Sequence, residues 1–360
     1  MKLFYSERQL LHREVREIAY GRISPANDRP ERTIAIRDAL LDAGLATLAE
    51  QEQSPVPLSV LHAVHEPAML RFLETLHERW QAQYPGTLPF PETSVAPGMR
   101  RTLPAALRGQ LAYFCFDTCA AVVEGTWAAV SASVAQAHGA ALAVAAGERL
   151  AFALCRPPGH HAGRDFYGGY CYLNTAAVAA EAWVQRTGTR CAILDVDFHH
   201  GNGTQHIFWE REDVFFASLH ASPEQAYPFL SGYADEQGAG AGFGSTWNVP
   251  LALATTWPAY RVELLRVLER IEQARPEALV VSLGTDTYRG DPVGGLGLEM
   301  PDFAALGAAI AELGMPTIVV MEGGYEMATV GECVAQFSAG LQNTITIGTG
   351  VELTGAEEPI

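Results

Sequence analysis

The stretch 191–205, CAILDVDFHHGNGTQ, places four apolar or small residues directly before two aspartates, two adjacent histidines and two glycines. The apolar run is typical of a strand that is buried on both faces of a sheet. In an extended chain, alternate side chains point to the same side. Asp195, Asp197 and His199 are therefore predicted to project together at the end of the strand, while Phe198 points the other way. Two carboxylates held side by side repel unless a cation lies between them, so the pattern indicates a divalent metal site.

Similar apolar runs recur along the chain and are separated by segments of helix length. Strands are predicted at 2–6, 149–155, 190–197, 213–220, 277–286 and 316–325, and helices at 66–83, 117–146, 173–187, 258–274, 302–313 and 328–341. Apolar strands that alternate with helices predict an α/β fold with a mostly parallel sheet covered on both faces. In such sheets, ligands bind outside the carboxyl ends of the strands.

Four of the predicted strands end in polar clusters that contain glycine. The clusters are RPPGHHAG (156–163), DVDFHHGNG (195–203), GTDTYRGDP (284–292) and EGGY (322–325). Because the carboxyl ends of parallel strands share one edge of the sheet, together they indicate one active site. Asp286 is then the natural third metal ligand beside Asp197 and His199. Three protein ligands leave an open position, as in a catalytic zinc site.

The other clusters supply a base and a hydrogen-bond donor. The adjacent His160 and His161, flanked by glycines, suggest a base with a partner that tunes it. Tyr325 is a neutral donor at pH 7, with a pKa of about 10, and can stabilise an oxyanion. Each residue alone is more often structural than catalytic. A metal, a base and an oxyanion donor together indicate metal-assisted amide hydrolysis.

The motifs RPPGHHAG, GGYCYLN, ILDVDFHHGNGTQ, FASLH, SLGTDTYRGDP and EGGYE together resemble the zinc-dependent histone deacetylase family, most closely its bacterial acetylpolyamine amidohydrolase branch. They lie within residues 150–330 in the family's order, and the N-terminal part matches more loosely. The resemblance implies an arginase–deacetylase fold, with one α/β domain around a parallel sheet of about eight strands. We expect this domain to span residues 1–345, followed by a tail over 346–360.

The resemblance also implies the bound ions. Zinc would be held by Asp197, His199 and Asp286, although this oxygen-rich set would also suit Fe²⁺ or Co²⁺. A structural potassium ion would lie beside it. Its expected ligands are Asp195, the backbone of Asp197 and His199, and Ser218 and Leu219 in the ASLH motif.

For catalysis, the resemblance implies that His161 is the general base and His160 its electrostatic partner. Asp195 would orient His160, and Asn202 would face His161. Many relatives have aspartate at the position of Asn202, so this base would lack a carboxylate partner and have a less raised pKa. Tyr325 would donate a hydrogen bond to the scissile carbonyl.

The implied substrate is a small acetylated amine, above all an acetylpolyamine. Tyr170, with Gly169 before it, and Tyr227 would form the walls of a narrow tunnel. The branch carries a long insertion that narrows the site and supports a homodimer, matched here by a proline-rich loop at about 85–109. In this chain the loop region carries three arginines that would oppose a cationic substrate if they lined the mouth. They are Arg100, Arg101 and Arg108.

Charge and composition exclude several other classes. The formal net charge is −17, which argues against a nucleic-acid partner and would concentrate cationic ligands. The N-terminus has no apolar core of a signal peptide, and no run of 18 uninterrupted apolar residues indicates a membrane span. Six cysteines without a CxxC pair predict buried free thiols and a cytoplasmic protein.

Other interpretations stay open at this point. An arginase-type hydrolase on the same fold would need a second metal and more bridging aspartates. A catalytically inactive binding module would have lost some of the positions that are filled here. A lysine deacetylase acting on acetylated peptides or proteins, or a hydrolase of other small amides, would use the same motifs, because the motifs carry the chemistry and not the substrate.

Overall fold

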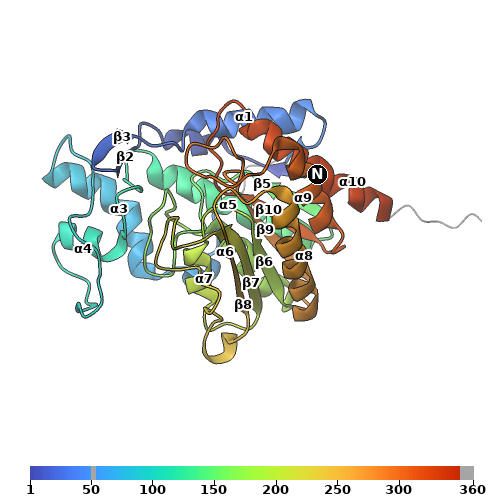
Figure 1. Ribbon diagram of the computed structural model, residues 1–360. Coiled ribbons are helices and arrows are strands. Elements are labelled where there is room, and N and C mark those ends of the chain that lie inside the picture. The colour runs from blue at the N-terminus through green and yellow to red at the C-terminus, as the bar shows by residue number, and fades with distance from the viewer. Residues whose placement is uncertain (50–53, 349–360) are drawn as a thin grey trace, which may run out of the picture.

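The computed structural model describes residues 1–49 and 54–348 as an α/β domain built on one parallel sheet (Figure 1). The strand order is β4-β1-β5-β10-β9-β6-β7-β8, and every neighbouring pair is parallel. The strands are β1 (Lys2–Phe4), β4 (Thr47–Leu48), β5 (Leu150–Ala153), β6 (Cys191–Asp195), β7 (Val214–Ala221), β8 (Thr246–Leu251), β9 (Ala278–Leu283) and β10 (Thr317–Met321). The predicted fold class is confirmed.

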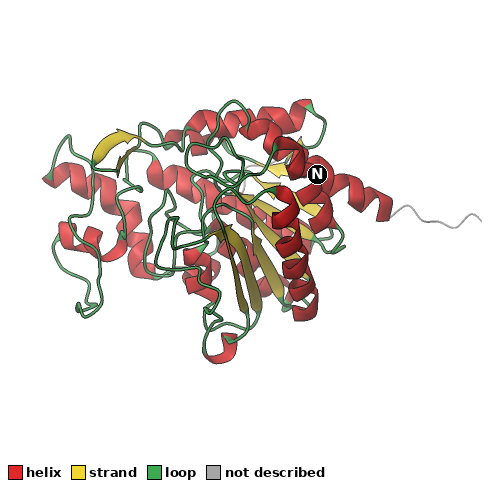
Figure 2. Ribbon diagram, viewed as in Figure 1, coloured by secondary structure: helices red, strands yellow, loops and turns green. Residues whose placement is uncertain are grey.

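Helices cover both faces of this sheet, as Figure 2 shows. They are α1 (Pro30–Asp42), α2 (Leu58–Val64), α3 (Pro67–Gln83), α4 (Leu107–Phe114), α5 (Thr126–Ala145), α6 (Thr175–Thr187), α7 (Asn202–Phe208), α8 (Trp257–Ala274), α9 (Met300–Ala311) and α10 (Val330–Gly348). A separate antiparallel hairpin joins β2 (Arg16–Ala19) and β3 (Arg22–Pro25).

The two cores follow from the alternation of side chains along the central strands. In β6, Cys191 and Ile193 face the core that contains α5 and α6, whereas Ala192 and Leu194 face the core that contains α8, α9 and α10. All five residues of β6 are buried. Apolar side chains on both faces therefore fix this strand at the centre of the sheet, with its polar end at the sheet's edge.

The sequence pattern identified the longer strands and missed the short or peripheral ones. It did not reveal β4, β8, the β2–β3 hairpin, or helices α1, α2, α4 and α7. Strand β8 contains Pro250, which lacks an N–H group and is tolerated because β8 lies at an edge of the sheet. Helix α10 runs to Gly348, so the expected boundary at residue 345 falls within it, and residues 349–360 lie outside the described residues.

Within the described part of the chain, α5 is the one helix long and apolar enough to cross a membrane by length and composition. In its most apolar window, 67% of the residues are buried inside the protein. Burial of this kind is usual for a central helix of a globular domain. All six cysteines are free, and five of them are buried.

Candidate active site

The four polar clusters lie together because their strands are neighbours. Strands β5, β10, β9 and β6 are adjacent in the sheet and parallel, so the loops that follow them leave from the same edge. Register brings Asp195 of β6 level with Ser282 of β9 and with Ser218 of β7. The fold thus brings together segments that are far apart in the chain. The loop that contains His160 and His161 follows β5, and the loop that contains Tyr325 follows β10.

The three expected metal ligands form one buried group. Possible ligand atoms of Asp197, His199 and Asp286 all lie within 4.8 Å of one another. Nδ1 of His199 lies 3.2 Å from Oδ1 of Asp197 and 3.1 Å from Oδ2 of Asp286. One imidazole and two carboxylates converging in this way could hold a divalent cation.

The electrostatics of this group fit a cation. Burial, together with the charge of Asp197, raises the pKa of Asp286 to about 7. Burial disfavours protonation of His199, but hydrogen bonds to Asp197 and Asp286 raise its pKa to about 9. The carboxylates of Asp197 and Asp286 therefore repel each other in this buried group, and a divalent cation between them would relieve the repulsion.

Glycines pack against these carboxylates. The N–H of Gly323 donates to Oδ2 of Asp197 at 2.8 Å. A Cβ atom at Gly323 would lie 2.4 Å from Oδ2 of Asp286, and one at Gly284 would lie 2.1 Å from Oδ2 of Asp197. Both distances are too short for a side chain, so the glycines of SLGTD and EGGY give the carboxylates room to converge.

The tandem histidines have different partners. Nδ1 of His160 lies 3.0 Å from Oδ2 of Asp195, whereas Nδ1 of His161 lies 2.7 Å from Oδ1 of Asn202. Burial opposes protonation of His160, yet the charges of Asp197 and Asp195 raise its pKa to about 10. Burial, with the neighbouring His160 and His199, holds the pKa of His161 well below its usual range. The two pKa values are thus shifted in opposite directions, and the lowered pKa of His161 suits a neutral base.

Two acidic residues that the sequence analysis did not single out position these loops. Oε2 of Glu322 accepts hydrogen bonds from the N–H groups of Gly159 and His160, at 2.7 and 3.1 Å. Oδ2 of Asp291 accepts from the N–H of Tyr325 at 2.6 Å. Both residues stand inside quoted motifs, EGGYE and TYRGDP, and their position next to glycine turns was the available signal.

A cavity of about 570 Å³ opens onto the His161, His199 and Tyr325 side chains. Its walls include Gly169, Tyr170 and Tyr227, as expected for a tunnel. The rings of Tyr170 and Tyr325 meet edge to face with centroids 5.6 Å apart, and that of Tyr227 meets His161 at 5.0 Å.

Phe198 also lines this cavity, contrary to the expectation that it points away from His199. The prediction was wrong because strand β6 ends at Asp195, so strict alternation does not extend through residues 196–199. Phe198 instead lies with its ring edge to face against His199, at a centroid distance of 4.9 Å.

The cavity contains a carboxylate that the sequence analysis missed, that of Glu17 in the β2–β3 hairpin. Tyr170 donates a hydrogen bond from its hydroxyl to Oε2 of Glu17 at 2.5 Å. Burial raises the pKa of Glu17, although Tyr170 opposes that shift. No sequence pattern linked Glu17 to the site, because the hairpin is far from the motifs in the chain.

The arginines of the proline-rich loop do not line this cavity. Arg101 pairs with Asp165, Arg108 pairs with Glu92, and the Nε of Arg100 donates to the hydroxyl of Thr102. These three arginines therefore do not place a positive charge on the cavity wall, where it would repel a cationic substrate.

The groups expected around potassium lie on adjacent strands. Asp195 ends β6, and Ser218 and Leu219 lie in the middle of β7 beside it. Oδ1 of Asp195 accepts from the N–H of Asp197 at 3.1 Å, and the hydroxyl of Ser218 lies 2.8 Å from Nδ1 of His220. All three residues are buried.

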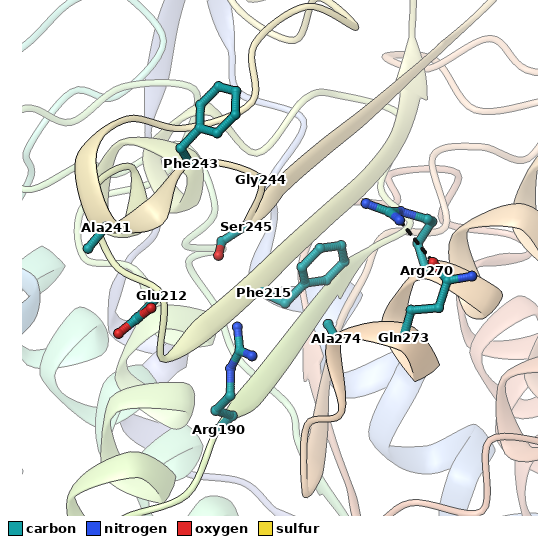
Figure 3. Close-up of a pocket in the computed structure, with 10 residues that line it drawn as sticks. All are labelled: Arg190, Glu212, Phe215, Ala241, Phe243, Gly244, Ser245, Arg270, Gln273 and Ala274. Carbon is teal, nitrogen blue, oxygen red and sulfur yellow. Dashed lines mark hydrogen bonds between the residues drawn. The ribbon is translucent and has the colours of Figure 1, made fainter.

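Another cavity, of about 260 Å³, lies at the amino-terminal ends of the strands, opposite the end that carries the polar clusters (Figure 3). Arg190 and Ser245, which line it, stand directly before β6 and β8. None of the strand-end clusters reaches this cavity. We therefore place the candidate active site at the carboxyl edge alone.

Comparisons with known proteins agree with this geometry. Residues 26–341 match the histone deacetylase domain. The chain is 43% identical over 333 residues to acetylpolyamine amidohydrolase 1 of Pseudomonas aeruginosa, covering 91% of this chain and 94% of that protein. It is 42% identical to acetylpolyamine amidohydrolase of Mycoplana ramosa, over 95% of this chain and 99% of that one. A crystal structure of acetylpolyamine aminohydrolase from Burkholderia pseudomallei superimposes with a TM-score of 0.90, at 36% identity, over 96% and 99% of the two chains.

Proposed function

The chain belongs to the histone deacetylase family, and from this premise we propose that it hydrolyses the N-acetyl amide of acetylpolyamines, releasing acetate and a free amine. The observation that carries the proposal is the cavity that joins the buried Asp197–His199–Asp286 group to a buried carboxylate, Glu17. One end of this cavity suits an acetyl amide, and the other suits an ammonium group.

Asp197, His199 and Asp286 would hold the metal, which we propose is zinc. When bound, a divalent cation would supply Lewis acidity to the acetyl carbonyl and lower the pKa of water at the site. The three-ligand set, which leaves a position open, supports a catalytic ion.

The protein groups that move protons are His161 and Tyr325. Nδ1 of His161 faces the carbonyl oxygen of Asn202, so Nδ1 carries the proton and Nε2 is left as the acceptor. His161 takes the proton of the attacking water and returns it to the departing amine nitrogen. Burial raises the pKa of Tyr325 well above its usual range, so its hydroxyl stays protonated and donates to the developing oxyanion.

Glu17 gives the site its preference for a cationic tail. Its side chain lines the cavity, and no arginine or lysine within residues 1–49 and 54–348 does so. Among the described residues its hydrogen-bond partner is the neutral Tyr170, so its charge is not neutralised by an ion pair. An ammonium group at the far end of a slim acetylated diamine would supply the missing positive charge.

The test compares kcat/KM for acetylputrescine, acetylcadaverine, an uncharged N-alkylacetamide of equal length and an acetyl-lysine peptide. We expect the acetylated diamines to react fastest. Glu17→Gln should reduce their advantage over the uncharged amide by about 10–100-fold, the value of a hydrogen bond to a charged group. Glu263→Gln, which removes a carboxylate paired with Arg266 on α8, away from the cavity, serves as the matched control. If the uncharged amide or the peptide reacted tenfold faster than both diamines, the polyamine assignment would fail.

We further propose that potassium binds at Asp195, Ser218 and Leu219, where two buried strands meet. The free cysteines support a reducing, cytoplasmic location. Replacing potassium in the buffer with tetramethylammonium should lower the melting temperature of the holoenzyme if this ion is structural.

We also propose that the proline-rich loop at 85–109 mediates a homodimer. Residues 85–106 form no regular helix or strand, so the loop gains little stability from its own backbone hydrogen bonds. Deleting 88–106 should give a smaller species in sedimentation and altered substrate selectivity. A full-length chain that sediments as a monomer at micromolar concentration would contradict the proposal.

A further inference from the structure

A pocket of about 410 Å³ lies behind the general base, on the other side of Asn202 from the catalytic cavity. We call it the rear pocket, and define it by the residues that line it: Phe166, Asn202, Gln205, His206, Trp209, Ser231 and Glu236. Three of these, Asn202, Gln205 and His206, belong to helix α7, which is labelled in Figure 1.

The carboxylate of Glu236 is the only acidic group among the lining residues. Its Oε2 accepts hydrogen bonds from Nε2 of Gln205 at 2.6 Å, from the N–H of Gly232 at 2.9 Å and from Nδ2 of Asn248 at 3.4 Å. All three donors are neutral, and in the part of the chain that the structure describes Glu236 forms no ion pair. The carboxylate is thus held in place by neutral donors alone.

A second layer fixes this carboxylate. Nδ2 of Asn248 donates to Oε1 of Gln205 at 2.7 Å, so the amide group of Gln205 is oriented with its Nε2 toward Glu236. Gln205 and Asn248 are both buried. The arrangement resembles a prepared binding group more than a freely rotating surface glutamate.

Aromatic side chains form the rest of the wall. Phe166 packs against His206 with ring centroids 4.9 Å apart, and Trp209 lines the same pocket. Aromatic rings beside an uncompensated carboxylate attract an alkylammonium ion, through the ring faces and through a charged hydrogen bond. A divalent metal would require more oxygen ligands than one carboxylate supplies.

From this geometry we infer that the rear pocket is a second amine-binding site, which takes the free primary alkylammonium group of a diamine or polyamine. The ammonium would donate to Glu236, and the methylene chain would lie against Phe166 and Trp209. The identity of this amine as reaction product rests on the proposed function. The binding itself does not.

Asn202 couples the two sites. Its Oδ1 contacts His161 while its side chain also lines the rear pocket. An amine in the rear pocket would contact Asn202, which orients His161. It can be bound there while a substrate fills the catalytic cavity. Inhibition by this route should therefore lower kcat rather than raise KM.

The binding test is calorimetric titration of the full-length holoenzyme with putrescine. We expect two sites in the wild-type protein and one in Glu17→Gln, which keeps the rear pocket. Glu236→Gln should weaken the rear site at least tenfold, the value of a charged hydrogen bond. Glu210→Gln removes an exposed carboxylate next to Trp209 that does not line the pocket, so it should bind as the wild type does. The uncharged 1,4-butanediol should not bind.

A second variant covers the case in which Glu236→Gln does not fold. Trp209→Leu keeps an apolar wall but removes the ring, and should weaken the rear site by about threefold to tenfold. Putrescine should inhibit turnover with a noncompetitive component, and this component should require more putrescine in either variant. Equal putrescine stoichiometry and affinity in the wild type, Glu236→Gln and Trp209→Leu would overturn the inference. The selectivity of Glu17 for acetylated diamines could still hold in that case, so the two proposals fail separately.

Discussion

At the residue scale, the three carboxylates of the site differ because their neighbours differ. Burial opposes ionisation of Asp197, but His160 and His199 hold its pKa well below the usual range. Asp286 is equally buried and has the charge of Asp197 beside it, so its pKa is raised to about 7. Asp195 is engaged by the imidazole of His160. Three aspartates thus have different environments: Asp197 and Asp286 are suited to bind a metal, and Asp195 orients His160.

Asp286→Asn should remove the metal and the activity. The carboxamide keeps the size of the side chain but supplies a neutral oxygen in place of a charged ligand, so cation affinity falls. Metal content per chain after dialysis, measured by plasma mass spectrometry, is expected to drop to background. Tyr325→Phe, which changes no ligand, should retain one metal per chain. A fully active Asp286→Asn enzyme that is free of metal would contradict the assignment.

His161→Ala should lower kcat by about 10²–10⁴-fold through loss of the general base. Tyr325→Phe should lower kcat by about 10²–10³-fold through loss of the oxyanion donor. Single-turnover rates on acetylputrescine measure both. Because neither residue belongs to the metal group, both variants should keep their metal. Loss of the metal from a folded variant would show that the roles are assigned wrongly.

At the scale of elements, the active site depends on turns that follow strands β9 and β10. Gly324, after β10, has a φ of +120°, and a Cβ atom there would lie 2.0 Å from Oγ1 of Thr285. This turn carries Tyr325, whose N–H is held by Asp291. Sheet pairing between β9 and β10 therefore places the proposed metal ligand Asp286 and the proposed donor Tyr325 on loops that leave the same edge of the sheet.

Gly324→Ala should distort that turn. We expect a loss of about 1–3 kcal/mol in the free energy of unfolding, from backbone strain at positive φ and the contact with Thr285. Turnover should fall as well, because Tyr325 moves. Gly314→Ala is the matched control, since Gly314 also has a positive φ, +63°, but faces open space. The free energies of unfolding of the two variants, measured in urea, separate the effect of the contact with Thr285 from that of the backbone strain. Equal decreases in the two variants would mean that the contact with Thr285 can relax.

At the scale of the whole molecule, burial of several neutral histidines makes stability depend on pH. Burial lowers the pKa of His65 to about 4 and that of His220 to about 4. His65 accepts a hydrogen bond at Nε2 from the N–H of Asn174, which requires the neutral ring. His12 is also buried, with a pKa lowered to about 3.

The contribution of these histidines to stability should therefore fall on acidification between about pH 6.5 and pH 4. Above pH 6.5 these rings are neutral in both states. Below it their imidazoles bind protons in the unfolded chain but not in the folded chain, so their contribution to the free energy of unfolding decreases as pH falls. Urea midpoints measured from pH 8 to pH 4.5 test this. His65→Gln should reduce the slope, and the exposed His62→Gln should not. A slope unchanged by His65→Gln would exclude this residue as a source of the effect.

The sequence by itself determined the elements whose signal is local. Continuous apolar runs predicted the central strands, because a strand buried on both faces needs apolar residues at every position. The same local rule placed the catalytic clusters, since parallel strands deliver their carboxyl ends to one edge. The ordered motifs then identified the family. The sequence alone also predicts that Asp197, His199 and Asp286 form one group, because they follow apolar strands of one parallel sheet.

Only the tertiary structure decided which distant groups meet. Glu17, in a hairpin near the N-terminus, reaches the cavity through packing and not through any motif. Arg101 and Arg108 pair with Asp165 and Glu92 and do not line the cavity. Phe198 does line it, because β6 has ended before this residue. Glu236 lies behind Asn202 in the same way. Such contacts depend on the summed packing of the whole chain, whereas strand patterns depend on a few neighbouring residues. That difference in range is why the motifs indicated the reaction and the substrate class, whereas the structure was required to bring Glu17 to the cavity.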